Sequence, residues 1–364
     1  METKFYQQLT EKALSHPACF DEELCRKILQ DKEIDVLSLV HAAYQLRKQF
    51  FGREVMVHVI NNVQNGFCPE DCHYCAQAKT SKANIEEYPL KPDHEILAEA
   101  KRAYESGAYR YCMVFAGRGP SEKRVEKLAQ LIQKIKQEFP IEICISAGLL
   151  DAPKAKILKE AGLDRLNHNL NTSEDHYPKI CTTHTYQDRM NTLAAAKQAG
   201  LQLCSGVIVG MGESVGDLLD VAFSLAKMNV ESIPVNFLVP IEGSALQNES
   251  EMTPEFCLRV LCLFRFLSPR AEIRVAAGRE LRLRELEVLA LYPANSLFLE
   301  GYLNTRGAKT SATLRMIQDA GFSVKSNCDL SELLKPEVKK PGQQGTRSNL
   351  KSLDELRPYL FTPQ

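Results

Sequence analysis

Three cysteines stand close together near residue 70. They occupy the run Cys68-Pro69-Glu70-Asp71-Cys72-His73-Tyr74-Cys75, a Cys-x₃-Cys-x₂-Cys pattern. Three thiolates cannot complete a tetrahedral zinc site, and they ligate only three of the four irons of a cubane cluster. The pattern therefore predicts a [4Fe–4S] cluster with one open iron. The alternative is a zinc knuckle with His73 as the fourth ligand, although its position directly beside Cys72 makes joint ligation awkward.

The chain has 12 cysteines in 364 residues, which is many for a protein kept in reducing conditions. Disulfides are rare there, so such a number favours metal ligands or redox chemistry. Free cysteine is also one of the most frequently buried residue types. Six cysteines are accordingly predicted to be small buried hydrophobic residues: Cys19, Cys25, Cys181, Cys257, Cys262 and Cys328.

The elements that must position the cysteine run alternate regularly along the chain. Eight β-branched runs are predicted as strands, at 55–60, 109–116, 141–148, 165–171, 201–209, 232–239, 272–277 and 295–299. Helix-period segments follow them, at 93–106, 121–138, 153–161, 185–199, 214–228, 254–267, 279–291 and 309–320. Eight strand–helix units predict an α/β (β/α)₈ barrel, with a doubly wound open sheet as the alternative.

The barrel segment is expected at residues 51–324. Residues 1–50 have helical apolar spacing and are predicted to form a helical N-terminal extension. Residues 325–364 turn polar, so a mobile C-terminal tail is expected.

Several predicted strands alternate between apolar and polar residues, whereas strands buried on both faces usually read as continuous apolar runs. The polar sets are Arg110 and Cys112; Glu142, Cys144 and Ser146; Asn167, Asn169 and Asn171; Asn236; Glu272 and Arg274. Because side chains alternate between faces, the apolar set must pack on the helices and the polar set must point into the barrel. Unpaired polar groups there would be costly, so the interior is predicted to hold ligands. The alternative is a lower layer of the barrel tied together by side-chain hydrogen bonds.

The cysteine triplet, with Tyr74 before its last member and a strand in front of it, resembles the signature of radical S-adenosylmethionine (SAM) enzymes. In that class the open iron chelates SAM, and electron transfer gives a 5′-deoxyadenosyl radical. The run Gly206-Val207-Ile208-Val209-Gly210-Met211-Gly212-Glu213 resembles the fifth-strand motif of the same class, which contacts the adenine.

Over residues 50–322 the chain resembles more narrowly the biotin synthase family, whose members insert sulfur between two unactivated carbons of dethiobiotin. The matching stretches are Tyr111-Cys112-Met113, Asn167-His168-Asn169-Leu170, Thr182-Thr183-His184-Thr185-Tyr186-Gln187-Asp188-Arg189, Cys204-Ser205-Gly206, Pro234-Val235-Asn236 and Ala277-Gly278-Arg279-Glu280. The resemblance implies a second cluster, of the [2Fe–2S] type, that provides the sulfur. Its ligands would be Cys112, Cys144, Cys204 and, unusually, Arg274. Sequence chemistry alone would make Arg274 a charge partner, because arginine is almost always protonated.

The same resemblance assigns further roles. Asn169 and Asn236 would bind the ureido ring of dethiobiotin, and a carboxamide suits a cyclic urea because it offers both a donor and an acceptor. Arg189 would pair with the methionine carboxylate. Tyr74, Ala116, Asn171 and Ile208 would contact SAM, with Asn171 standing where some family members have an aspartate for the ribose. His168 and His184 are expected to be structural.

Charge and hydropathy limit the partners. With 45 basic and 46 acidic residues the net charge is −1, which gives no field that attracts nucleic acid. No stretch approaches the roughly 20 apolar residues that span a bilayer, and no signal peptide is evident, so a cytoplasmic protein without a membrane partner is expected. The resemblance implies an electron donor such as flavodoxin or ferredoxin, iron–sulfur assembly proteins and a homodimer.

Two other functions stay open from the sequence. One is a different radical SAM enzyme that acts on an amino-acid-like substrate and needs only the first cluster. The other is a non-catalytic iron–sulfur carrier or zinc-binding protein.

Overall fold

A computed structural model describes residues 2–15, 19–246, 252–331 and 333–334 of the chain. Its N-terminal part forms the helices α1 (Glu2–Ser15), α2 (Glu22–Gln30) and α3 (Val36–Phe51). Asp21 and Asp35 accept hydrogen bonds from the first turns of α2 and α3, which satisfies backbone donors that have no partner inside a helix. Arg259 donates to the carbonyls of Ile28 and Ile34, so this helical part is fastened to the rest of the fold.

Parallel strands close into a barrel. Its members are β1 (Glu54–Gln64), β2 (Arg110–Phe115), β3 (Glu142–Ser146), β4 (Arg165–Asn167), β5 (Gln202–Cys204) with β6 (Val207–Val209), β7 (Ser232–Phe237), β8 (Glu272–Val275) and β9 (Ser296–Phe298). Each strand pairs with the next, and β9 pairs in parallel with β1, which closes the ring. The predicted (β/α)₈ barrel is therefore confirmed, and the open sheet is excluded because β1 and β9 would be edges in it.

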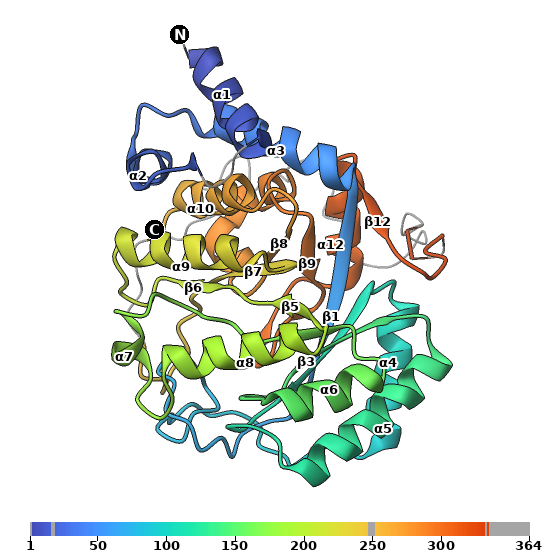
Figure 1. The fold of residues 1–364 in the computed structure, drawn as a ribbon. Coiled ribbons are helices and arrows are strands. Elements are labelled where there is room, and N and C mark those ends of the chain that lie inside the picture. The colour runs from blue at the N-terminus through green and yellow to red at the C-terminus, as the bar shows by residue number, and fades with distance from the viewer. Residues whose placement is uncertain (1, 16–18, 247–251, 332, 335–364) are drawn as a thin grey trace, which may run out of the picture.

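Helices surround this barrel (Figure 1). They are α4 (Asp93–Glu105), α5 (Glu122–Glu138), α6 (Ala152–Glu160), α7 (Tyr177–Ile180), α8 (Tyr186–Gln198), α9 (Val215–Met228), α10 (Pro254–Leu267), α11 (Arg279–Leu283) and α12 (Thr310–Asp319). Between β9 and α12 lies a small hairpin of β10 (Gly301–Tyr302) and β11 (Thr305–Arg306), and β12 (Ser323–Lys325) adds to the start of β1.

Three predicted elements differ in detail. The strand expected at 165–171 ends at Asn167, the last residue of β4. The single strand expected at 201–209 is split into β5 and β6 at Ser205 and Gly206. A Cβ atom at Gly206 would lie 1.9 Å from the carbonyl oxygen of Pro234, so only glycine allows the two backbones to approach this closely. The helix expected at 279–291 is the short α11 followed by a 3₁₀ helix, Arg284–Leu291.

The alternation of polar and apolar residues divides the interior into two clusters. Tyr111 and Met113 of β2 belong to the large core between the strands and the helices. Cys112, which lies between them in the sequence, belongs to a separate cluster inside the barrel with Cys144 and Cys204. The prediction that these cysteines point into the barrel is thus confirmed. Residues 335–364 of the expected tail lie outside the described residues.

Candidate active site

A cavity of about 280 Å³ opens at the carboxyl ends of the strands. Its wall contains most of the predicted site residues: Cys68, Cys72, Tyr74, Cys75, Cys112, Ala116, Cys144, Asn169, Asn171, Arg189, Ile208, Asn236 and Arg274. Cys204 is fully buried beside this wall. The fold therefore brings together residues that are spread over more than 200 positions of the sequence. This is the usual place for the active site of a (β/α)₈ barrel.

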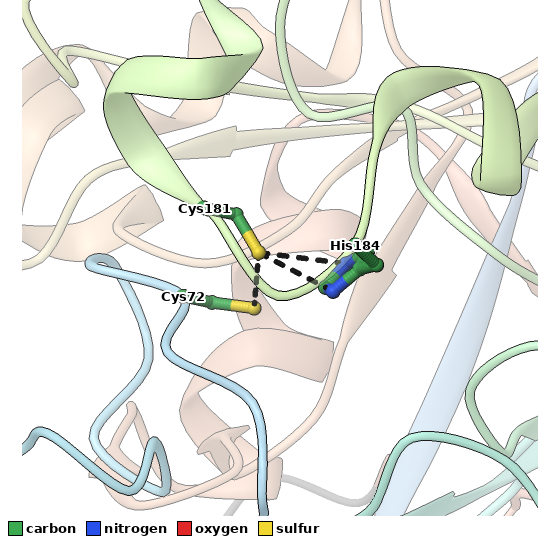
Figure 2. Close-up of side chains that lie close together, drawn as sticks. All are labelled: Cys72, Cys181 and His184. Atoms are coloured by element: carbon green, nitrogen blue, oxygen red, sulfur yellow. Dashed lines mark hydrogen bonds between the residues drawn. The ribbon is translucent and has the colours of Figure 1, made fainter.

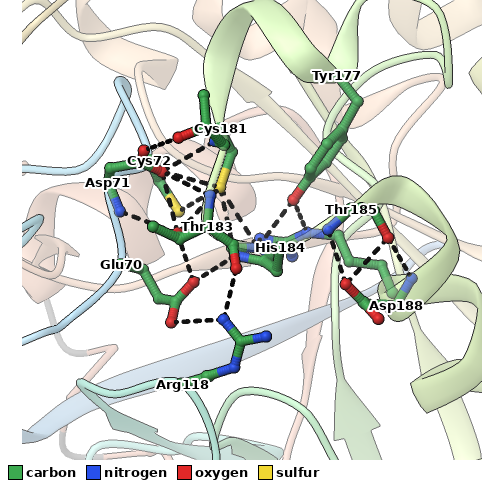
Figure 3. A network of polar contacts seen from close by, with 12 residues as sticks. Glu70, Asp71, Cys72, Arg118, Tyr177, Cys181, Thr183, His184, Thr185 and Asp188 are labelled. Carbon is green, nitrogen blue, oxygen red and sulfur yellow. Dashed lines mark hydrogen bonds and ion pairs between the residues drawn. The ribbon is translucent and has the colours of Figure 1, made fainter.

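The loop with the three cysteines is fastened to the segment before α8 by two carboxylates (Figure 3). Asp71 accepts hydrogen bonds from the backbone amides of Thr182 and Thr183, 3.0 and 3.2 Å away, and from both hydroxyls. Glu70 accepts from the Thr183 hydroxyl and lies 2.6 Å from His184 Nδ1. Burial alone would raise the pKa of Asp71, but these hydrogen bonds lower it strongly. The loop is therefore held in place by interactions outside the cysteines themselves.

Cys72 turns its thiol toward this same segment. Its Sγ atom lies 3.7 Å from Sγ of Cys181, which in turn lies 3.3 Å from Nδ1 of His184 (Figure 2). Among the described residues, these three form the one group of metal-ligating side chains whose ligand atoms all lie within 4.8 Å of one another. His73 belongs to no such group among the described residues. Cys68 and Cys75 line the cavity but do not belong to this group. Burial raises the pKa of Cys75 to about 11, so a metal must displace its proton.

Tyr74 joins two of the residues expected to contact SAM. Its hydroxyl accepts a hydrogen bond from Asn171 Nδ2 at 2.7 Å and from Arg189 Nη2 at 3.0 Å. Asn171 has a φ of 71°, a left-handed conformation that asparagine tolerates better than most residues. This conformation follows the end of β4 and turns the side chain toward Tyr74. The three side chains form one connected wall of the cavity.

Arg189 is 8% exposed and donates to the carbonyl oxygen of Asn169, to Tyr74 and to Tyr177. It forms no ion pair with an acidic side chain of the described chain. A buried guanidinium whose neighbours are all neutral leaves a positive charge without a counterion. The cavity at this point favours an anionic group. Burial lowers the pKa of the neighbouring His168 well below its usual value, so that imidazole stays neutral.

Deeper in the barrel, three thiols and one guanidinium meet. Cys112 and Cys144 are direct neighbours in the register of β2 and β3, and Cys204 belongs to the same buried cluster. Arg274 Nη1 lies 3.7 Å from Cys204 Sγ. The Nε atom of Arg274 is buried and has no hydrogen-bond partner among the described residues. Free thiols on adjacent strands and an unsatisfied nitrogen beside them fit a cluster with mixed sulfur and nitrogen ligands.

Below these thiols lies a floor of charged side chains centred on Glu272. Its carboxylate lies 3.0 Å from Arg110 Nη1, 2.8 Å from Arg165 Nη1, and also contacts Arg274 Nη2. Burial alone would raise the pKa of Glu272, but the arginines hold it well below its usual value. The hydrogen-bonded lower layer considered above as an alternative therefore exists, but it occupies only the bottom of the barrel. The cavity lies above it.

The two asparagines expected to bind a urea differ in how many of their hydrogen-bonding groups are still free to contact a ligand. Asn169 Oδ1 accepts from Gly206 N and Asn167 Nδ2, at 3.1 and 3.2 Å, whereas its own Nδ2 has no partner within the described part of the chain. Asn236 is buried, donates to the carbonyl oxygen of Val207 at 3.0 Å and accepts from Ala277 N at 3.2 Å. Both side chains therefore have fixed amide orientations. Asn169 presents a free donor to the cavity.

Sequence reasoning missed some participants. Cys181 is buried as predicted, but it is a polar partner of Cys72 and not an inert residue. Cys25, Cys257 and Cys262 are buried as predicted, whereas the prediction was wrong for Cys19, which is exposed, and for Cys328, which is partly exposed. Both lie outside the barrel, Cys19 between α1 and α2 and Cys328 after β12. The network of Glu70 and Asp71 could have been found only by knowing that residues more than 100 positions away face them.

No helix among the described residues is long and apolar enough to cross a membrane.

Comparison with known proteins defines the class first. Residues 63–225 match the radical SAM superfamily, and residues 234–323 match the biotin and thiamin synthesis associated domain. Methylornithine synthase has a similar solved structure, with a TM-score of 0.73 at 22% identity, over 90% of this chain and 100% of that one. The [FeFe]-hydrogenase maturase HydG from Carboxydothermus hydrogenoformans gives 0.74 at 18% identity, over 89% and 80%. These likenesses concern the fold alone. The fold and the cysteine loop are those of a radical SAM enzyme.

Sequence relatives narrow the class. The chain is 56% identical over 312 residues to biotin synthase from Acaryochloris marina, which covers 86% of this chain and 90% of that protein. It is 44% identical over 321 residues to biotin synthase from Bacillus subtilis, covering 88% and 96%. The chain belongs to the biotin synthase family. Its expected cofactors are accordingly a [4Fe–4S] cluster, SAM and a [2Fe–2S] cluster.

Proposed function

We propose that this chain converts dethiobiotin to biotin by inserting one sulfur atom between two unactivated carbons. The observation that carries the proposal is the presence of two separate thiol sets at two depths of one cavity. Cys68, Cys72 and Cys75 belong to the outer loop, and Cys112 and Cys144 line the same cavity deeper in the barrel. A radical enzyme that only rearranges an amino-acid side chain needs no inner set. An iron–sulfur carrier needs no polar cavity.

In this proposal the outer loop holds the [4Fe–4S] cluster through Cys68, Cys72 and Cys75. When bound, this cluster and SAM supply the 5′-deoxyadenosyl radical that removes hydrogen from the substrate. Glu70 and Asp71 keep the loop in position through their hydrogen bonds to the segment before α8.

SAM would bind against the wall formed by Tyr74, Asn171 and Arg189. Arg189 has no acidic partner in the described chain, so the methionine carboxylate is a suitable counterion. Asn171 offers an amide to the ribose hydroxyls. Ala116 and Ile208 also line the cavity and would provide apolar surface for the rest of the cofactor.

The inner set, Cys112, Cys144, Cys204 and Arg274, would hold the [2Fe–2S] cluster. When bound, this cluster supplies the sulfur atom of the product. Glu272 and Ser232 both accept hydrogen bonds from Nη2 of Arg274, which fixes the direction of the guanidinium toward Cys204. Asn169 and Asn236 would hold the urea of dethiobiotin between the two cluster sites. The reacting carbons would then face the interior, away from solvent thiols.

The test is an anaerobic reaction with dethiobiotin, SAM and a strong reductant, after only the second cluster has been rebuilt with isotopically labelled sulfide. Biotin that contains the label is expected. Because each chain holds one such cluster, about one biotin per chain should form until the cluster is rebuilt. Biotin without the label, analysed by mass spectrometry, would contradict the assignment of the inner set.

Partners complete the proposal. Reduction requires an electron donor, such as flavodoxin or ferredoxin, and rebuilding of the second cluster requires iron–sulfur assembly proteins. The 12 free cysteines support a reducing, cytoplasmic location. The family leads us to expect a homodimer, and light scattering would measure the oligomeric state.

A further inference from the structure

The group formed by Cys72, Cys181 and His184 lies at the edge of the proposed cluster site, but only Cys72 has a role there. Cys181 and His184 come from the segment between α7 and α8 and belong to neither cluster (Figure 2). We propose that the cluster-free chain binds a single zinc ion through Cys72, Cys181 and His184. The competition with cluster assembly that follows rests on the proposed role of Cys72. The zinc site itself rests on geometry alone.

The distances are those of ligands to one ion. Zinc–sulfur bonds of about 2.3 Å in a tetrahedron put two sulfur atoms about 3.8 Å apart, and a sulfur and a nitrogen atom about 3.5 Å apart. The Cys72 and Cys181 sulfur atoms are 3.7 Å apart. Sγ of Cys181 lies 3.3 Å from Nδ1 and 3.8 Å from Nε2 of His184. An ion could therefore enter with small side-chain movements.

The orientation of His184 fits a metal ligand. Its Nδ1 atom lies 2.6 Å from Oε2 of Glu70, so Nδ1 carries the proton and Nε2 carries the lone pair that a metal would need. A carboxylate on the opposite nitrogen is the usual arrangement for metal-binding histidines, because it fixes the tautomer and makes the ring more basic. In the metal-free chain Nε2 faces donors from Tyr177 and Arg189, at 2.9 and 3.0 Å. An ion would replace these two hydrogen bonds.

Charge also favours a divalent cation here. Four negative groups lie here: the two thiolates that a metal requires, and the carboxylates of Glu70 and Asp71. Oδ1 of Asp71 lies 3.3 Å from Cys181 Sγ. The positive groups nearby are Arg118, which contacts Glu70 (Figure 3), and Arg189, which contacts Nε2 of His184. Four negative charges then face two positive ones, and a divalent cation supplies the missing two. The site is buried at all three ligands, which strengthens these interactions.

Sharing of Cys72 has a direct consequence. Zinc at this site takes one of the three ligands of the proposed [4Fe–4S] cluster, so zinc and cluster exclude each other. Zinc found in protein purified without iron is then compatible with the radical function. It marks chains that have not received their cluster.

The test uses the full chain after iron and sulfide have been removed under reducing, anaerobic conditions, so that no disulfide forms. Zn²⁺ is titrated against a coloured chelator, and Co²⁺ is used as a spectroscopic probe of tetrahedral thiolate ligation. Wild-type protein should bind one Zn²⁺ per chain and give the thiolate-to-cobalt charge-transfer band. Cys181→Ala should weaken zinc binding by more than about 100-fold, beyond the 10–100-fold typical of losing an outer hydrogen-bond partner. Cys328→Ala removes a thiol elsewhere and serves as the matched control.

Two further variants separate this site from the cluster. Cys68→Ala should bind zinc like wild type but fail to build the first cluster, whereas Cys181→Ala should build that cluster even with zinc present. Equal zinc affinity of the Cys181→Ala and Cys328→Ala proteins would overturn the zinc site, as would loss of zinc binding in Cys68→Ala. A first cluster that forms normally in Cys72→Ala would instead overturn the proposed function and leave the zinc site standing.

Discussion

Glu272→Gln tests whether the charged floor supports the barrel and the inner site. The substitution keeps the shape of the side chain but removes its charge. Glu272 is 3% exposed and contacts three buried guanidinium groups, those of Arg110, Arg165 and Arg274. Removal of one partner from a buried ion pair costs about 3–5 kcal/mol, because the remaining charge stays buried without compensation. With three arginines sharing one carboxylate, we expect the upper part of this range.

Such a loss is a large fraction of the 5–15 kcal/mol by which most domains are stable. The assay is urea unfolding of the cluster-free chain, followed by circular dichroism. Glu160→Gln is the control, because Glu160 pairs with Lys156 at 3.8 Å while both side chains are well exposed. It should change the free energy of unfolding by no more than about 0.5 kcal/mol. A Glu272→Gln protein as stable as this control would refute the reasoning.

The variant has a second readout. In the variant a single neutral amide oxygen replaces two charged oxygens that now serve three arginines. The hold on Nη2 of Arg274 is therefore weakened, although the Ser232 hydroxyl still accepts from it. The second cluster should then assemble poorly while the first assembles normally, which visible absorption and iron analysis can distinguish.

The remaining predictions concern the proposed site. Cys72→Ala should remove the first cluster and abolish cleavage of SAM, since two thiolates cannot hold a cubane with one open iron; undiminished 5′-deoxyadenosine would count against the assignment. Asn236→Leu should leave both clusters intact but weaken dethiobiotin binding by about 1–3 kcal/mol, as a buried urea loses a partner; equal affinities of the two proteins in calorimetry would refute it. Cys204→Ala should keep the first cluster and its radical chemistry but form no biotin, and biotin production by this variant would show that the inner set is dispensable.

The sequence by itself determined the strand–helix order, the inward direction of many polar residues and the cysteine loop. These follow from local rules, because side chains in a strand alternate between faces whatever surrounds them. Cys112 and Cys144 could thus be placed inside the barrel without a structure. The family resemblance added roles for the same positions.

Tertiary structure alone decided which distant residues meet. Cys72 and Cys181 are 109 positions apart, and Glu272 of β8 meets Arg110 of β2 and Arg165 of β4. Alternation tells which face of a strand a residue occupies, but not how far strand tilt moves it along the barrel axis. It also does not tell how two loops come to rest against each other. Cys181 was therefore predicted as an inert buried residue, although the fold places its sulfur beside a proposed cluster ligand.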